Sequence, residues 1–205
     1  MTENGFEYVD LGLPSGTMWA TCNVGATKPE DDGLLFQFGR VDGYRYDDTN
    51  HKFRTNDQNF QDIRNEFIPK TTSGKVYKEN EILDLNDDAA HVNMGGKWRM
   101  PTNDEFKELL NNTTHNLVTI NGALGMMFTS NTNGYQLFIP FMQGSWYDGT
   151  WFSSGGIYAS MWSSQVGPSN SIYAYLLYCN YSSLVCTGGN HCSCAFSVRG
   201  VFRKY

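Results

Sequence analysis

Most residues of this chain that could bind a ligand or react chemically lie in its last quarter. Residues 146–198 are rich in aromatic, serine, asparagine and glycine side chains, and no Asp, Glu, Lys or Arg lies between Asp148 and Arg199. Tyrosine and tryptophan supply contact area at low entropic cost, and serine, asparagine and glycine form adaptable hydrogen bonds, so this mixture is typical of binding surfaces. We therefore expect this region to bind a ligand through uncharged contacts.

The cysteines offer a second kind of chemistry. Four of them share the region with a histidine, and the fifth lies near the N-terminus: Cys22, Cys179, Cys186, His191, Cys192 and Cys194. An odd number of cysteines argues against a disulfide framework, and the spacing C-x4-H-C-x-C matches no familiar zinc site. A reactive thiol needs a nearby cation, helix N-terminus or metal, and only His191 is close in the sequence. We expect no metal, no cofactor and no enzymatic activity; catalysis by Cys192 or Cys194 is the alternative.

Several residue types are missing from the region between Val166 and Val198. Lys, Glu, Gln, Met and Trp do not occur there, although they form roughly one residue in six of the whole chain. No codon that ends in a pyrimidine encodes any of them. The runs 178–181 (YCNY) and 190–194 (NHCSC) contain residues that arise when the adenines of AAY asparagine codons are randomised. The pattern predicts a diversified segment; the alternative is a β-rich segment, because strands disfavour Glu and Lys.

The elements that must hold this region are short. Apolar runs between turn residues predict a hairpin of strands at 8–11 and 17–20, and further strands at 33–39, 117–120, 126–128, 136–141, 160–164, 172–180 and 196–201. Helices are predicted at 84–91 and 101–112, with a short one at 57–67 inside a long loop from 40 to 80. Thr102 and Glu105 form a capping box, and Arg99 is expected to pair with a buried carboxylate or carbonyl. These elements predict an α+β domain of short antiparallel strands, two short helices and long loops.

Length and charge limit the class of protein. The 205 residues suit a single domain, which we divide into a scaffold at 1–145 and a variable ligand-binding region at 146–198. The net charge is -6 and the basic residues are scattered, so we expect no nucleic-acid partner. No apolar run reaches the ~18 residues of a membrane helix, and the first residues lack the pattern of a signal peptide, so membrane insertion is not expected.

Several motifs resemble one known family. They are YVDLGLPSGTMWA at 8–20, NVGA at 23–26, WRMPT at 98–102, WSS at 162–164 and FSVR at 196–199. Together they resemble the paralogous domain that is abundant in Bacteroides and Fibrobacter proteins, which is related to the C-type lectin-like fold of formylglycine-generating-enzyme-type domains. The match spans nearly the whole chain. It departs from the usual family ending, where Asn and Arg precede the closing Ser-Val-Arg, because residues 191–195 here read HCSCA.

The resemblance implies a function. The family includes the variable proteins of diversity-generating retroelements, often phage-borne, in which adenine-directed mutagenesis rewrites a C-terminal stretch on a lectin-like scaffold. A protein of this kind would recognise a bacterial surface protein or glycan from a phage virion (tail or fibre tip) or from a bacterial cell surface. The alternative is a constitutive adhesin or fimbrial-type subunit with a fixed ligand.

The resemblance also implies which side chains stay fixed and which vary. Trp162, Leu177, Val198 and Arg199 would belong to the fixed scaffold. If Leu177 and Cys179 point inward, then alternate residues of strand 174–180 point outward. The predicted ligand-binding residues are these outward side chains together with loop aromatics and the last loop: Trp146, Tyr147, Trp151, Tyr158, Tyr173, Leu176, Tyr178, Asn180, Tyr181, Asn190, His191 and Ser193.

Overall fold

The computed structural model of the 205-residue chain describes residues 1–43, 71–142, 155–168, 172–182 and 185–204. It also describes the backbone of four short strands that lie between these ranges. The described part of the chain is mostly β-sheet with two α-helices, which is the α+β composition that the sequence predicted.

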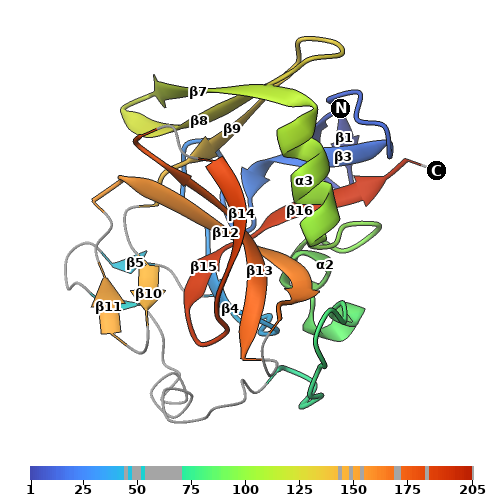
Figure 1. Cartoon of the computed structure of the whole chain (residues 1–205), viewed down its shortest axis with the longest axis vertical. Coiled ribbons are helices and arrows are strands. Elements are labelled where there is room, and N and C mark those ends of the chain that lie inside the picture. Colours follow the sequence, from blue (N-terminus) through green and yellow to red (C-terminus); the bar gives the residue numbers. More distant parts are fainter. Residues whose placement is uncertain are drawn as a thin grey trace.

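The largest sheet is built around the C-terminal strands. Its order is β11-β10-β15-β12-β13-β14, and β4 pairs with β15 beside this path. The strands are β4 (Leu35–Gln37), β10 (Ser145–Tyr147), β11 (Thr150–Phe152), β12 (Tyr158–Val166), β13 (Tyr173–Asn180), β14 (Val185–His191) and β15 (Ala195–Ser197). Strands β12, β13 and β14 are antiparallel neighbours and fan across the centre of the molecule (Figure 1).

Three smaller sheets surround it. The first has the order β1-β2-β3-β16 and joins the two ends of the chain, and the predicted hairpin of β2 and β3 is confirmed. The second is β7-β8-β9, at the top of Figure 1, and the third is β5-β6. Their strands are β1 (Thr2–Glu3), β2 (Phe6–Val9), β3 (Thr17–Asn23), β5 (Tyr46–Asp47), β6 (Lys52–Phe53), β7 (Thr113–Ile120), β8 (Ala123–Ser130), β9 (Gln136–Pro140) and β16 (Arg199–Arg203).

The two predicted helical segments are confirmed with different bounds, because the first extends three residues beyond the predicted end at 91 and the second is shorter than the predicted 101–112. The first consists of the 3-10 turn η2 (Leu85–Asp87) followed by α2 (Ala89–Met94), and the second is α3 (Asn103–Asn111). Thr102 accepts from the Glu105 amide while the Glu105 carboxylate accepts from the Thr102 amide, which is the predicted capping box. Glu105 also accepts from Arg99 Nη1 at 2.7 Å, so the predicted partner of Arg99 is a buried carboxylate.

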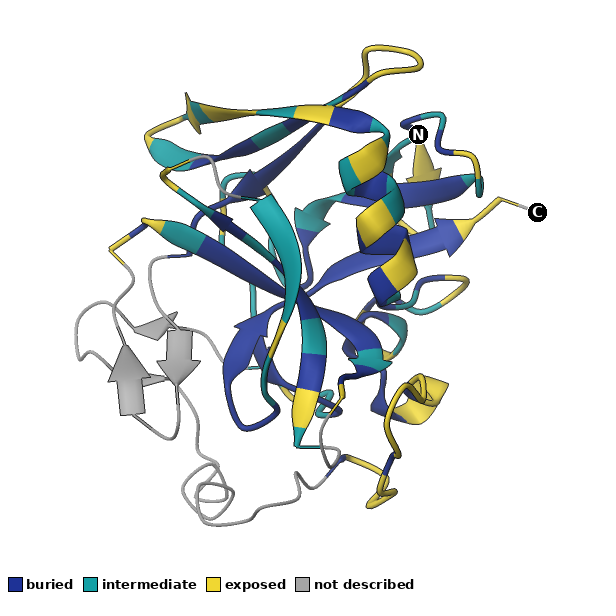
Figure 2. Cartoon of the chain, viewed as in Figure 1, coloured by how far each residue is buried: buried dark blue, intermediate teal, exposed yellow. Residues whose placement is uncertain are grey.

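Two hydrophobic clusters lie on opposite faces of β12 and β13. On β13, Ala174 and Leu176 belong to the first cluster, while Leu177 and Cys179 belong to the second, which also contains Phe106 of α3. Because successive side chains of a strand point to opposite faces, this alternation means that β13 is covered on both sides. Figure 2 shows that β12 is mostly buried and that β13 alternates between buried and partly exposed residues, whereas β14 is partly exposed along its length.

Two strand predictions need correction. The expected strand at 196–201 is two strands, β15 and β16, which pair with different sheets on either side of Val198. Strand β14 lies where the sequence predicted a loop, because its Gly188-Gly189 pair hides the alternation that marks a strand. The predicted helix at 57–67 lies outside the described residues.

Candidate functional site

Strand register decides which predicted residues share a face. Tyr178 lies opposite Ser160 of β12 on one side and opposite Cys186 of β14 on the other. Leu176 lies between Trp162 and Gly188 in the next row. Directly opposed residues of antiparallel strands point to the same face, so these rows form one continuous surface.

This surface contains a hollow of about 280 Å³, which we call the β12–β14 hollow. Its lining residues are Tyr158, Ser160, Leu176, Tyr178, Cys186, Gly188, Gly189, Asn190 and Phe196. No charged side chain is among them. The volume is at the lower end of the ~300–1,000 Å³ of ligand pockets, so the hollow suits one side chain or one ring. Four of the predicted ligand-binding residues meet here: Tyr158, Leu176, Tyr178 and Asn190.

A glycine opens the hollow. A Cβ placed on Gly188 would meet no atom within 4 Å, and the backbone there is not in the left-handed region. A Cβ could therefore be added at position 188 without a clash, and glycine leaves that space empty. The rings of Tyr158 and Tyr178 border this space, with centroids 5.8 Å apart and planes tilted by 30°.

Asn190 and Tyr178 are two of the polar residues at the hollow. The Asn190 Oδ1 accepts from the His191 amide at 2.8 Å and from Cys194 Sγ at 3.6 Å, which fixes the amide plane of Asn190. Its Nδ2 has no hydrogen-bond partner in the part of the chain that the structure describes. The same holds for the half-buried Tyr178 hydroxyl within those ranges. A ligand in the hollow would thus meet aromatic faces, the Asn190 amide donor and hydroxyl groups, among them that of Tyr178.

A second group of predicted residues lies at the end of β13 and β14. Tyr173 is opposite His191 in the register, and their rings meet edge to face at 5.7 Å. Ser193 Oγ lies 2.6 Å from His191 Nδ1. By strand alternation Tyr173 and His191 point away from the face that carries the hollow. These two side chains therefore lie on the opposite face of the sheet and do not line the β12–β14 hollow.

Two fully buried side chains, Trp162 and Arg199, connect strands of the fold. Trp162 is fully buried, donates from Nε1 to the Phe36 carbonyl at 2.9 Å, and packs on the ring of Phe196 with centroids 4.8 Å apart. Arg199 is also fully buried and donates to Asn23 Oδ1 and to the carbonyls of Ala20, Thr21 and Phe138. These bonds tie β16 to β3 and β9. Burial lowers the pKa of Arg199 to about 10, so it remains charged at neutral pH.

The cysteines of the region have different surroundings. Burial raises the pKa of the Cys179 thiol, and burial together with the nearby Cys194 raises the pKa of Cys192. A raised pKa disfavours the thiolate, which is the nucleophilic form. Cys186 is half-buried and lines the hollow. Among the described residues, no three His, Cys, Asp or Glu side chains gather in a way that could hold a metal ion.

Two predicted site residues are not at the surface. Leu176 does point away from Leu177, as predicted. However, it points into the first hydrophobic cluster, so it is only 4% exposed. It forms the floor of the hollow. Ser193 is also 4% exposed, because its hydroxyl is held by His191. Asn190 and His191 end a strand and do not belong to a loop.

The remaining predicted residues are spread along the region. Tyr181 is 59% exposed at the turn after β13. Asn180 lies opposite Tyr158 and accepts from the Ser182 amide at 3.0 Å, so it shares the hollow's face and caps that turn. The side chains of Trp146, Tyr147 and Trp151 lie outside the described residues.

Sequence reasoning missed part of the hollow. The hollow is also lined by Ser160, Cys186, Gly188 and Phe196. None of these four residues stands out in the sequence as a ligand-binding residue. Only the pairing of β14 with β13 brings Cys186 and Gly188 to this face. The isolated Gly-Gly in an otherwise strand-like run was the one available signal, since such glycines mark close approach of a ligand or backbone.

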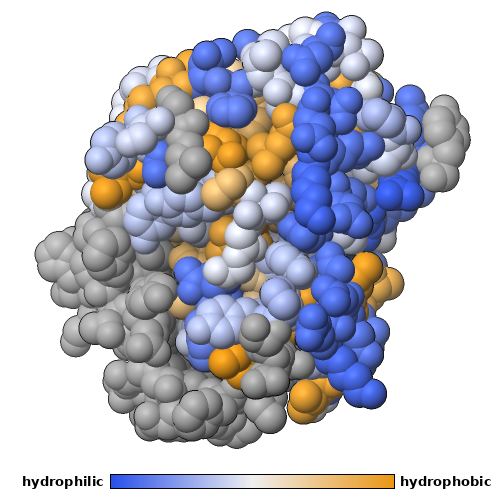
Figure 3. All heavy atoms as spheres, viewed as in Figure 1, coloured by the Kyte–Doolittle hydropathy of each residue, from blue (hydrophilic) through white to orange (hydrophobic). Residues whose placement is uncertain are grey.

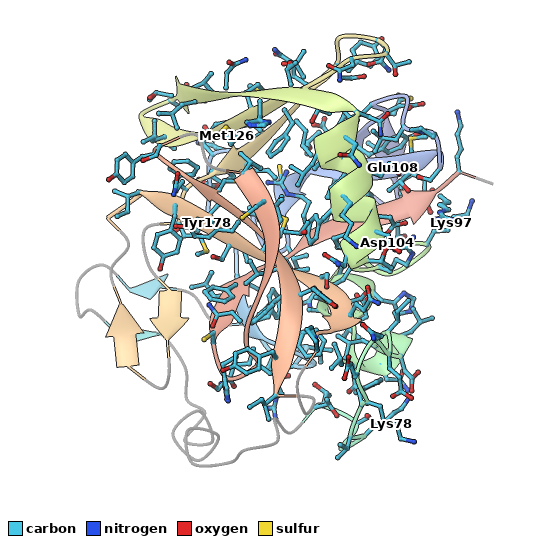
Figure 4. All side chains as sticks on the ribbon, viewed as in Figure 1. Lys78, Lys97, Asp104, Glu108, Met126 and Tyr178 are labelled. Carbon is cyan, nitrogen blue, oxygen red and sulfur yellow. The ribbon has the colours of Figure 1, made fainter. Side chains whose placement is uncertain are left out.

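The surroundings of the site differ in polarity. A band of hydrophilic side chains covers α3, whereas paler and more hydrophobic atoms lie beside it over the central strands (Figure 3). Figure 4 shows Tyr178 at the left of the sheet, across from Asp104 and Glu108 on α3.

Within the described ranges, no helix combines the length and hydropathy that a membrane span requires. Comparison of the chain with protein-family models, with curated proteins and with solved structures gave no match.

Proposed function

We propose that this chain is a non-enzymatic ligand-binding protein with a C-type lectin-like fold, and that a retroelement diversifies the surface encoded by residues 146–198. Its ligand would be a bacterial surface protein or glycan, reached from a phage virion or from a bacterial cell surface. The proposal rests first on the family resemblance of the motifs and on the absence of Lys, Glu, Gln, Met and Trp from 166–198.

One structural observation supports it above the others. Tyr158, Tyr178 and Asn190, which are far apart in the sequence, border one uncharged hollow. Aromatic rings and an amide around an open space are groups that bind without a fixed charge pattern. Such a surface accepts many sequences, because no buried ion pair has to be kept.

The division between frame and surface also supports the proposal. Trp162, Leu177, Val198 and Arg199, which the resemblance assigns to the fixed scaffold, are at most 1% exposed. Tyr178, Asn180 and Asn190 are half-buried on the outer side of that frame. Substitutions at these three positions would change this surface. Those at Tyr178 would also remove packing against the first hydrophobic cluster, so their effect on stability would exceed the ~0.5 kcal/mol of ordinary surface changes.

The thiol environments favour binding over catalysis. Burial raises the pKa of Cys179 and Cys192, so neither is activated as a nucleophile. The environment of Cys192 therefore does not support the alternative, raised from the sequence, that this thiol is catalytic.

A swap experiment tests the function. Two naturally occurring or designed versions of the chain, identical at 1–145 and different at outer positions of 146–198, are screened against bacterial surface proteins and glycans. We expect the set of bound ligands to change while the thermal midpoint changes by only a few degrees. A matched pair that differs instead at exposed positions of β7 provides the control. Unchanged specificity after the C-terminal swap would contradict the proposal.

The origin of the diversity has its own test. Sequencing of the flanking DNA should show a near-identical template repeat beside a reverse-transcriptase gene. The repeat should differ from the segment encoding 146–195 only at adenines of the repeat. Absence of such a repeat, together with a single invariant sequence across isolates, would favour the adhesin with a fixed ligand.

A further inference from the structure

Strand β14 is an edge strand. It pairs with β13 on one side, and in the described part of the chain no strand pairs with its other side. An edge strand presents unpaired N–H and C=O groups, which can form hydrogen bonds with an added strand. Natural proteins usually protect such an edge with Lys, Pro, a bulge or a covering helix. Helix α3 lies close to β14, on the face that carries Val185 and the second hydrophobic cluster and not on the face of the β12–β14 hollow. The sequence of β14, VCTGGNH, contains neither Lys nor Pro, and its register with β13 is unbroken.

The backbone hydrogen bonds show which residues of β14 face outward. Cys192 donates its amide to the Ile172 carbonyl at 2.8 Å, so this pair is of the hydrogen-bonded type. Hydrogen-bonded and non-hydrogen-bonded pairs alternate along an antiparallel ladder. The even residues of β14 therefore bond to β13, and Val185, Thr187 and Gly189 turn their amides and carbonyls away from it. The β12–β13 ladder has the matching phase, because Tyr181 donates to the Ile157 carbonyl at 3.0 Å.

The outward edge has a defined end. The next outward amide is that of His191, and it donates to the Asn190 side chain at 2.8 Å. The free edge therefore extends from Val185 to Gly189. Gly189 is exposed, and Val185 and Thr187 are half-exposed.

The β12–β14 hollow lies directly beside this edge. Gly188 faces the hollow and has no side chain, so a residue placed opposite it on an added strand could lean across it toward Tyr178 and Tyr158. Aromatic side chains that cover an edge glycine of a neighbouring strand are a known way to stabilise pairing. The volume of the hollow, about 280 Å³, suits one such side chain.

We propose that β14 binds an extended polypeptide segment of its ligand by strand addition, with one aromatic or large apolar side chain of that segment in the β12–β14 hollow. This inference rests on the proposed ligand-binding function and selects a protein ligand over a glycan. Main-chain hydrogen bonds supply sequence-independent affinity in this mode, and the hollow supplies side-chain specificity. Variation around the hollow would then change which side chain is preferred, while the ladder stays the same.

The test uses a displayed library of uncharged nonapeptides with a fixed central Phe. Selected peptides are measured by fluorescence anisotropy against the full chain. We expect Thr187→Pro to weaken binding at least tenfold, because proline removes an outward donor but no bond to β13. Gly188→Phe should weaken binding by a similar factor because the new ring occupies the hollow.

Thr119→Pro is the matched control. Thr119 is an exposed threonine on β7, which is also an edge strand. Asn131 donates to the Asn112 carbonyl, which places the Thr119 amide on the outward side of β7 by the same alternation. This variant should bind the peptides as the unchanged chain does.

Peptide chemistry provides a readout that does not depend on protein variants. N-methylation of the bound peptide at every second amide should abolish binding, whereas methylation of the intervening amides should have little effect. If binding is insensitive to methylation and to Thr187→Pro, strand addition is wrong. Binding of glycans alone, lost in Gly188→Phe but kept in Thr187→Pro, would overturn this inference and leave the proposed function intact. Concentration-dependent dimers that Thr187→Pro dissociates would show that the edge binds a second copy, which also overturns it.

Discussion

Substitution of Gly188 gives the sharpest test of how the hollow is built. A Cβ at this position meets nothing within 4 Å and requires no left-handed backbone. Gly188→Ala should stabilise the fold by about 0.5–1 kcal/mol, because glycine in a strand interior loses more backbone entropy on folding than alanine.

A larger side chain should add to this effect. If the ring of Gly188→Phe buries about 100 Å² against Tyr158 and Tyr178, it contributes about 2.5 kcal/mol at ~25 cal/mol per Å². Loss of rotamer freedom removes about 0.5–1 kcal/mol of that. For a chain of 205 residues, a net gain of about 2 kcal/mol raises the thermal midpoint by about 5 °C. The same variant should lose ligand binding, so stability and function change in opposite directions.

Gly125 in β8 supplies the matched control. It is also a strand glycine outside the left-handed region, but a Cβ there would lie 2.5 Å from Phe138 Cζ. Gly125→Ala should therefore destabilise the fold by about 1–3 kcal/mol through overpacking. Urea unfolding followed by tryptophan fluorescence measures both variants. If Gly188→Phe proves destabilising by 1 kcal/mol or more, the hollow is not open at β14 and the assigned register is wrong.

Three further predictions concern the frame and the thiols. Burial alone would raise the pKa of Glu105, but the hydrogen bonds and charge of Arg99 lower this pKa overall. The stability that the Arg99–Glu105 pair supplies is therefore complete above the unfolded-state pKa of ~4.3. It is lost as the pH falls through the lower pKa of the folded state. Glu105→Gln should cost about 3 kcal/mol at pH 7 and should flatten the acid limb of stability measured by urea titration; an unchanged acid limb would refute the assignment. Thr102→Ala removes the N-cap of α3 and should cost about 1 kcal/mol, whereas Thr102→Ser should cost little in the same assay. Cys192 is buried and has a raised pKa, so it should not react with a thiol reagent at pH 8 until the chain unfolds. The half-buried Cys186 should be labelled in the native protein. Peptide mass spectrometry locates the labels, and rapid labelling of Cys192 in the native protein would contradict its buried position.

The local elements were predictable because short-range chemistry specifies them. The Thr102 and Glu105 pair marks the start of α3 through bonds that span three residues. The turn between β7 and β8 follows from Asn121 and Gly122, which both adopt positive φ. In each case the residues that make the contact are neighbours in the sequence.

The position of each side chain in the sheet was not predictable in the same way. Leu176 was expected at the surface, but β13 has a hydrophobic cluster on both faces, and alternation in one strand cannot show what covers each face. Strand β14 was missed because its two glycines carry no hydropathy signal. Its existence depends on pairing with β13, which is a contact between segments that the sequence does not identify.

The sequence by itself determined the character of the C-terminal region: uncharged, aromatic, and without Lys, Glu, Gln, Met or Trp between 166 and 198. Composition is a property of the chain and survives any fold. Only the tertiary structure decided that Tyr158, Tyr178 and Asn190 border one hollow while Tyr173 and His191 point away from it. The physical reason is that strand register, and not order along the chain, sets which side chains become neighbours.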